Sequence, residues 1–243
     1  MLSLFWTPAE QLPAGSGFAL FGAAHVCWLV ILAAAGALGA WQYRRCSDRV
    51  RHRIGWAVSG ALLLLELVRQ VVLFVHGCAS VYYLPFHLCS LSMFVLVVHT
   101  LRPTVFTGEV LYALGMPGAF AALLLPDWAA CPPVHFMAFQ GFLGHGLIVW
   151  LVVCKLWRRE IVPSVKRIWM PAVFLAGSAA VMTLVNRALG TNYLFLQQPP
   201  SALLSLSESL GIWGYRAVLF GMVLLVWLLL YLPGICRWRK KEG

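Results

Sequence analysis

Long apolar runs separated by short polar turns are the main pattern along this chain of 243 residues. Seven of these runs have a length and hydrophobicity typical of helices that cross a bilayer. Their boundaries are residues 18–41, 54–77, 84–101, 110–126, 134–156, 169–189 and 213–233. We therefore predict an all-α fold, a polytopic membrane protein built as a seven-transmembrane-helix bundle.

The third and fourth runs are the shortest, and each contains a proline, Pro85 or Pro117. Proline removes a backbone donor and kinks or interrupts a helix. Non-helical backbone at membrane depth is tolerated where it is buried in protein or lines a cavity. We expect kinks or partial unwinding at these two positions.

Positive charge gives the orientation of the predicted bundle. All Lys and Arg residues except Arg69, Arg187 and Arg216 lie in four short segments at the ends of the runs or between them. Basic residues gather in the cytoplasmic loops of membrane proteins. We predict an N-out/C-in topology, with residues 1–17 as an exoplasmic tail, residues 18–234 as the transmembrane domain and residues 235–243 as a basic cytoplasmic tail.

Composition and net charge narrow the choice of partners. Hydrophobic residues make up 61% of the chain and charged residues 11%, which is unlike a soluble domain. The net charge of +10 lies at the ends of the runs rather than on one face. We expect it to meet anionic lipid headgroups and no nucleic acid.

Polar residues inside the apolar runs fall almost entirely in the exoplasmic half of the predicted topology. A charged group at the centre of a bilayer costs about 2.5–3.5 kcal/mol on insertion scales. The collection therefore predicts a shared polar cavity that opens outward, with almost no polar groups in the cytoplasmic half. Its members are Glu66, Arg69, Gln70, His87, Cys89, Ser90, Gln140 and His145.

Glu66 and Arg69 are three residues apart and share a helix face. In one interpretation the two charges neutralise each other and hold helices together. In the other, Arg69 binds a phosphate or a developing oxyanion while Glu66 orients a neighbour. Both interpretations can hold at once.

Cys89 is a candidate nucleophile, because a thiol becomes reactive when a base or a positive field stabilises its thiolate. His87 precedes it by two residues, and His145 lies on another run of the same direction. Residues two apart on a helix point about 200° apart, so His145 is the better partner. The alternative is that Cys89 is only a small packing residue.

A metal site is an alternative way to use the histidines. Zinc requires three or four convergent ligands, whereas two of the four histidines lie near helix ends and neither Asp lies inside a run. We predict no metal and no cofactor. The four histidines are His76, His87, His135 and His145.

Two cysteines, Cys78 and Cys131, fall in exoplasmic turns next to the third and fifth runs. They either form a disulfide in an oxidising compartment or remain free thiols. A disulfide would tie together the two helices that carry Cys89 and His145.

Three separate motifs resemble the signature segments of the YwaF-like integral membrane proteins, a bacterial family related to the animal transmembrane-protein-164 acyltransferases. The motifs are Tyr83-Leu84-Pro85-Phe86-His87-Leu88-Cys89-Ser90, Phe139-Gln140-Gly141-Phe142-Leu143-Gly144-His145-Gly146 and Gly190-Thr191-Asn192-Tyr193-Leu194. The resemblance covers nearly the whole chain. In the animal relatives a membrane-embedded cysteine and histidine transfer an acyl chain between phospholipids, and these positions match Cys89 and His145.

The resemblance implies an acyl-thioester on Cys89, formed from a phospholipid ester of the outer leaflet while His145 takes the thiol proton. His87, Ser90, Gln140, Glu66 and Arg69 would support the reaction or bind substrate, and some would stabilise the oxyanion. Phospholipids and lysolipids are the expected partners, in a cell membrane and specifically the bacterial cytoplasmic membrane.

Three residues near the predicted cavity mouth, Asn186, Asn192 and Tyr193, contact a headgroup or simply cap the sixth helix. The activity also has alternatives. A lipid hydrolase, with or without a metal, and a lipid-binding or sensor protein without turnover both fit the same residues.

Overall fold

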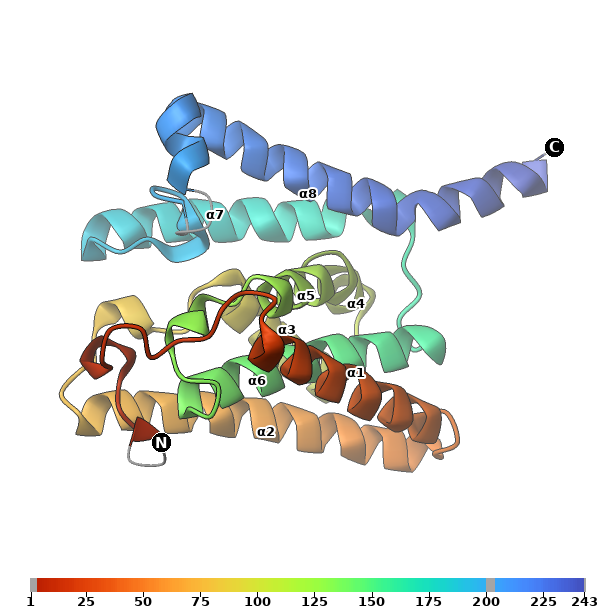
Figure 1. Ribbon diagram of the computed structural model, residues 1–243. Coiled ribbons are helices and arrows are strands. Elements are labelled where there is room, and N and C mark those ends of the chain that lie inside the picture. Colours follow the sequence, from red (N-terminus) through yellow and green to blue (C-terminus); the bar gives the residue numbers. More distant parts are fainter. Residues whose placement is uncertain (1–3, 200–203, 243) are drawn as a thin grey trace.

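The computed structural model describes residues 4–199 and 204–242, and every regular element in this part of the chain is a helix. The predicted all-α class is confirmed. Residues 1–3 of the predicted exoplasmic tail and Gly243 of the predicted basic tail lie outside the described residues. The main helices are α1 (Ala23–Tyr43), α2 (Asp48–Val75), α3 (Leu88–Leu101), α4 (Val105–Val110), α5 (Met116–Leu124), α6 (Phe136–Trp157), α7 (Trp169–Leu189) and α8 (Leu204–Glu242) (Figure 1).

Six helical stretches in the described residues are long and apolar enough to cross a membrane. They are Ala23–Tyr43, Asp48–Val75, Val105–Ala130, Phe136–Trp157, Val165–Leu189 and Glu208–Leu232. The remaining predicted span, residues 84–101, contains α3, which has only 14 residues. At about 1.5 Å per residue, α3 is about 21 Å long, against about 30 Å for a hydrocarbon core. The described residues therefore contain six candidate spans, whereas the seventh crossing and the N-out orientation stay predictions.

α3 begins at Leu88 because the residues before it do not continue a helix. Pro85 fixes its own φ and disfavours the helical conformation in the residue before it. The chain instead forms a 3₁₀ turn at Val81–Tyr83, and His87 is extended at the N-cap of α3. Cys89 consequently lies in the first turn of α3.

The helix that contains Pro117 is distorted, as the sequence predicts. Between α4 and α5 the backbone forms a π-helical segment, Leu111–Gly115. Pro117 has no N–H to donate to the carbonyl of Ala113, four residues earlier. The indole Nε1 of Trp227 on α8 donates to that carbonyl instead, at 3.0 Å. One proline thus produces both the local distortion and a docking point for α8.

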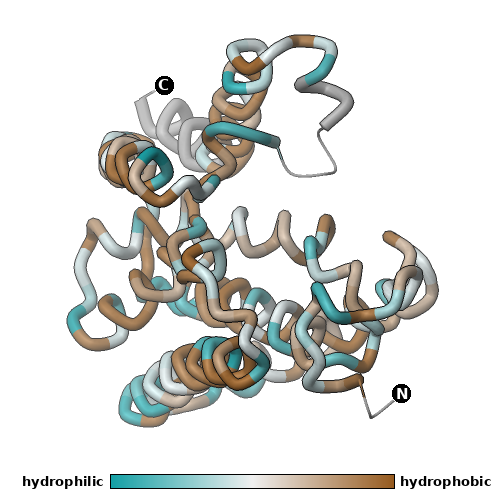
Figure 2. The backbone as a smooth tube through the Cα atoms, turned by 90° about the vertical axis from the view of Figure 1, so that its left-hand side faces the viewer, coloured by the Kyte–Doolittle hydropathy of each residue, from teal (hydrophilic) through white to brown (hydrophobic). Residues whose placement is uncertain are grey.

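The helices form two groups along the chain. α6 packs against α1, α2 and α5, and α3 packs against α2. α7 and α8 lie on the other side of α4 and the π-helical segment (Figure 1). An apolar cluster joins them there through Leu114, Leu175 and Trp227. Hydrophobic colours cover most of the length of the helices, as lipid-facing helices require (Figure 2).

The described part of the N-terminal tail is folded against the start of α6. The N–H of Phe136 donates to the carbonyl of Phe5 at 3.0 Å, and the His135 ring donates from Nε2 to the carbonyl of Thr7 at 2.8 Å. Further along, the N–H of Phe18 donates to the carbonyl of Ala129 at 2.9 Å. The tail is therefore part of the bundle and not a free extension.

The expectation that polar groups are nearly absent from the predicted cytoplasmic half is wrong. Glu109 on α4 is 1% exposed. Its carboxylate accepts hydrogen bonds from the N–H of Ser164 (2.9 Å), Nε of Arg167 (2.7 Å) and the hydroxyl of Tyr231 (2.7 Å). Because Glu109 stands just before the fourth apolar run, its burial could not be read from that run. It joins α4, the loop before α7 and α8.

Candidate functional site

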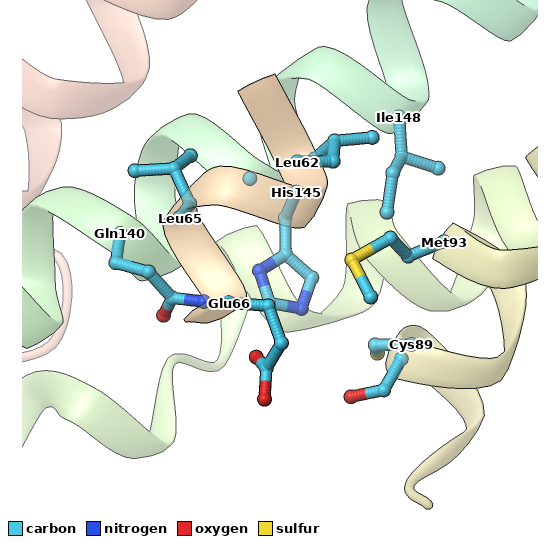
Figure 3. Close-up of a pocket in the computed structure, with 10 residues that line it drawn as sticks. Leu62, Leu65, Glu66, Cys89, Met93, Gln140, His145 and Ile148 are labelled. Carbon is cyan, nitrogen blue, oxygen red and sulfur yellow. The ribbon is translucent and has the colours of Figure 1, made fainter. Parts of the chain in front are cut away.

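α2, α3 and α6 line a small, partly open cavity of about 50 Å³ (Figure 3). That volume holds roughly one or two water molecules. Its lining residues are Leu62, Leu65, Glu66, Cys89, Ser90, Met93, Gln140, Gly144, His145 and Ile148.

The cavity brings together five of the residues selected from the sequence. Cys89 and Ser90 come from the first turn of α3, Gln140 and His145 from α6, and Glu66 from α2. Among the described residues, neither the Ser90 hydroxyl nor the Gln140 amide has a hydrogen-bond partner. Two neutral hydrogen-bonding groups beside a thiol are therefore free to bind a ligand.

The imidazole of His145 is held in one tautomer. Its Nδ1 lies 2.7 Å from the carbonyl oxygen of Gly141, and a carbonyl can only accept, so Nδ1 carries the hydrogen. Nε2 then has a free lone pair. In Figure 3 the ring lies between Gln140 on one side and Met93 and Cys89 on the other. This arrangement suits a general base.

One aromatic residue that the sequence reasoning missed, Trp128, covers the imidazole of His145. Trp128 lies in the 3₁₀ turn Asp127–Ala130. The two rings stack with centroids 5.0 Å apart and planes inclined by 25°. Neither the turn nor the apolar surroundings of Trp128 gave a signal. The Nδ1 hydrogen bond, by contrast, could have been inferred from the sequence, because Gly141 and His145 are four residues apart on one predicted helix.

Glu66 has its charge paired inside the protein. Arg69 donates from Nε to Oε2 (3.0 Å) and from Nη2 to Oε1 (2.6 Å), and Gln70 donates to Oε1 at 2.7 Å. Arg69 and Gln70 both also donate to the carbonyl of Tyr83, at 2.8 Å. This network matches the interpretation in which the two charges neutralise each other. It attaches α2 to the segment that leads into α3, and Arg69 does not line the cavity.

His87 lies outside the cavity lining. Its ring packs against Tyr193 at 5.4 Å and against Phe195 at 5.0 Å between centroids. The structure thus places His145, and not His87, in the same cavity as Cys89.

The three residues expected near the cavity mouth are engaged with the loop after α7. Asn186 accepts from the N–H of Tyr193 (2.7 Å) and the hydroxyl of Thr191 (2.9 Å). The side-chain oxygen of Asn192 accepts hydrogen bonds from two backbone N–H groups that lie later in the same loop. The hydroxyl of Tyr193 donates to the carbonyl of Val81. These contacts match the capping alternative and fasten the end of α7 to the segment before α3.

The histidines of the metal alternative do not converge. In the described part of the chain, no group of three or more His, Cys, Asp or Glu residues is placed to hold a metal ion. His76 bonds to the carbonyl of Val72 and His135 to that of Thr7. These four histidines are therefore not brought together in the described part of the chain.

Cys78 and Cys131 are both free thiols in the structure. Cys131 is buried, whereas Cys78 is partly exposed and accepts a hydrogen bond from Gln11 at 3.3 Å. Burial raises the pKa of the Cys131 thiol to about 11. Cys131 is therefore protonated and unreactive at neutral pH.

Comparisons with known proteins assign the chain to a family through a family model and not through individual relatives. Searches of curated proteins and of solved structures found no match to this chain. A family model described as the TMEM164 family matches residues 20–231. That match includes all eight residues proposed for the cavity and its support. The chain therefore belongs to the TMEM164 family.

Proposed function

We propose that this protein is a lipid acyltransferase that uses Cys89 and His145 on phospholipid esters of the outer leaflet. One observation carries the proposal. A single cavity contains a thiol, an imidazole with a free lone pair, and two neutral groups without partners, contributed by α3 and α6. These are the parts that acyl transfer through a thioester requires.

The reaction begins when Nε2 of His145 takes the proton of Cys89 while Sγ attacks the ester carbonyl carbon. The tetrahedral intermediate breaks its bond to the glycerol oxygen. That oxygen takes the proton from His145 and leaves as the hydroxyl of a lysolipid. The acyl chain stays on Cys89 as a thioester. The hydroxyl of a second lysolipid then attacks the thioester, with His145 again as the base.

The amide of Gln140 and the hydroxyl of Ser90 support the oxyanion of the intermediate. Both are free to donate, and both line the cavity that holds Cys89. Glu66 and Arg69 support the site indirectly. Their hydrogen bonds hold α2 against the segment that precedes α3. A neutral oxyanion site suits a low-dielectric cavity, since it adds no buried charge.

Hydrolysis is a second candidate, and the size of the cavity favours it. A space of about 50 Å³ admits water beside Cys89. Water in place of the second lysolipid would release a free fatty acid from the same thioester. The nature of the product separates the two reactions.

The topology belongs to the same proposal. We place the N-terminus outside and the C-terminus inside, in a bacterial cytoplasmic membrane, with α3 and the turn before it forming the seventh crossing. Cys89, in the first turn of α3, then lies near the outer leaflet. Phospholipids and lysolipids are the proposed partners.

Intact-protein mass spectrometry tests the proposal. The protein is incubated with phosphatidylcholine or phosphatidylethanolamine, and wild type is compared with Cys89→Ala and His145→Ala. We expect a fatty-acyl adduct that hydroxylamine removes, in wild type alone. Cys27→Ala is the matched control, because Cys27 is an exposed thiol on α1, and it should keep the adduct. A wild type without adduct, fatty acid or new acyl-lipid would reject the enzyme and favour a lipid-binding protein.

A further inference from the structure

The second feature that fixes His145, besides its hydrogen bond to Gly141, is the indole of Trp128. Trp128 is 9% exposed. Its face lies on the imidazole, and its ring meets Phe142 edge-on at 5.3 Å between centroids. One hydrogen bond and one stacked face together define the plane of the imidazole.

Gly141 makes both contacts possible. Its carbonyl accepts the hydrogen bond from Nδ1 of His145. A Cβ on residue 141 would lie 2.4 Å from Cδ2 of Trp128, closer than real contacts allow. Any side chain at this position would move the indole away from its place beside α6. The glycine in the motif therefore explains how a tryptophan reaches the histidine.

No acidic side chain is hydrogen-bonded to His145 within the described residues. The carboxylate of Glu66 lines the same cavity, but it already accepts hydrogen bonds from Arg69 and Gln70. Asp127 precedes Trp128 and is exposed. The third group that usually orients a catalytic imidazole is thus a carbonyl oxygen, because neither Glu66 nor Asp127 forms a hydrogen bond to His145 in the described part of the chain.

The face of the indole suits a ring that becomes positive during the reaction. When Nε2 takes the Cys89 proton, the imidazole becomes a cation, and an aromatic face attracts cations. Among the described residues, the Nε1 of Trp128 is buried without a partner. An unpaired buried N–H is unfavourable, so the contribution of Trp128 comes from its ring face and not from its N–H.

We propose that Trp128 is the positioning residue for His145. Its indole fixes the plane of the imidazole and stabilises the imidazolium that forms as Cys89 attacks the ester. The inference rests on the proposed function of Cys89 and His145. It assigns to an uncharged residue the stabilising role that a carboxylate has in other catalytic triads.

The test measures how fast the thioester forms in Trp128→Leu, Trp128→Phe and wild type, over a range of phosphatidylcholine mole fractions. We expect Trp128→Leu to lower the limiting rate about 30-fold and to leave the half-saturating mole fraction unchanged. Trp128→Phe keeps an aromatic face without the N–H and should restore most of the rate. Equal rates in wild type and Trp128→Leu would overturn the proposal.

Two further variants separate positioning from general packing. Trp28→Leu is the matched control, because Trp28 stacks on Phe142 at 5.0 Å and does not contact His145. It should keep the wild-type rate, and a loss equal to that of Trp128→Leu would count against the proposal. Gly141→Ala should displace the indole. The rate of the Gly141→Ala, Trp128→Leu double variant should be close to that of the slower single variant.

A readout that needs no activity separates this inference from the proposed function. Nitrogen-15 NMR of labelled histidine, assigned by comparison with His145→Gln, reports the tautomer of His145. We expect a single Nδ1–H tautomer in wild type and in Trp128→Phe, and a tautomer mixture in Trp128→Leu. A wild type without thioester but with this pattern would reject the function alone. An unchanged tautomer in Trp128→Leu, like an unchanged rate, would reject the positioning role.

Discussion

At Cys89 the local backbone decides what the side chain can do. The helix begins one residue earlier, at Leu88, so Cys89 and Ser90 lie side by side in the first turn and both line the cavity. His87 has extended backbone and turns its ring toward Tyr193. His87 therefore has different surroundings from Cys89 and Ser90, although all three lie within four residues of sequence.

Part of this site can be read from the sequence, because chemistry-bearing residues inside apolar runs are rare. Cys89, Gln140 and His145 stand out for that reason. Trp128 does not, since an aromatic residue in an apolar turn is ordinary and its contact with His145 depends on how α5 and α6 pack. The free state of the Gln140 amide also needs the structure.

Gln140→Ala is expected to slow the proposed thioester formation by about 10²-fold, because it removes one donor from the proposed oxyanion site. The half-saturating mole fraction of lipid should change little, since the donor acts on the transition state. Single-turnover mass spectrometry gives both quantities. Gln42→Ala, at an exposed position on α1, is the control, and equal rates in the two variants would remove Gln140 from the oxyanion site.

Glu66→Gln is expected to destabilise the protein by about 3–5 kcal/mol, because it leaves the guanidinium of Arg69 unpaired. The two side chains are 12% and 13% exposed, so water replaces the lost partner poorly. Thermal unfolding in detergent measures the loss. The double variant Glu66→Gln, Arg69→Met removes both charges and should recover much of the stability; a double variant as unstable as the single one would contradict this account.

At the scale of elements, the apolar runs located every long helix, but the ends differ: α2 begins at Asp48 rather than at residue 54, and α8 ends at Glu242 rather than at residue 233. The run at 84–101 is shortened by Pro85, and the run at 213–233 is extended toward the N-terminus. There α8 begins at Leu204 and breaks at Gly211, whose φ of +66° suits glycine. Hydrophobicity sets how long a helix can be in lipid, whereas proline and glycine set where it starts.

Trp227→Phe is expected to loosen the attachment of α8 by about 1–3 kcal/mol, because it removes the indole N–H that donates to the carbonyl of Ala113. Pro117→Ala supplies an N–H four residues after Ala113. In that background the same Trp227→Phe change should cost less. Unfolding in sodium dodecyl sulfate measures the four stabilities, and equal costs in both backgrounds would show that Pro117 does not create the need for Trp227.

For the whole molecule, the sequence predicted a membrane protein but not how its helices are arranged. Apolar faces in lipid do not encode their partners, because lipid is as apolar as another helix. The specific joints are polar. Glu109 joins α4 to α8, and Tyr193 joins the loop after α7 to the segment before α3. Such polar contacts between helices can be identified only when the positions of both partners are known.

The predicted orientation is testable with two native cysteines. Cys46 follows α1 and Cys78 follows α2, and both are partly exposed. In intact cells, a membrane-impermeant maleimide should label a variant that keeps only Cys78 and should not label one that keeps only Cys46. Permeabilised cells should label both. The reverse pattern would place the N-terminus inside.

The small cavity also determines how substrate concentration acts. The cavity is about 50 Å³, so in the proposed reaction the acyl chains stay in the surrounding leaflet and both lipids reach Cys89 by diffusing sideways within it. The effective concentration is then two-dimensional, the fraction of the leaflet that is substrate. Diluting the substrate with an inert lipid slows turnover, whereas adding more vesicles of the same composition does not. The proposed acyltransferase would thus respond to the composition of its own membrane and not to the total amount of lipid around it.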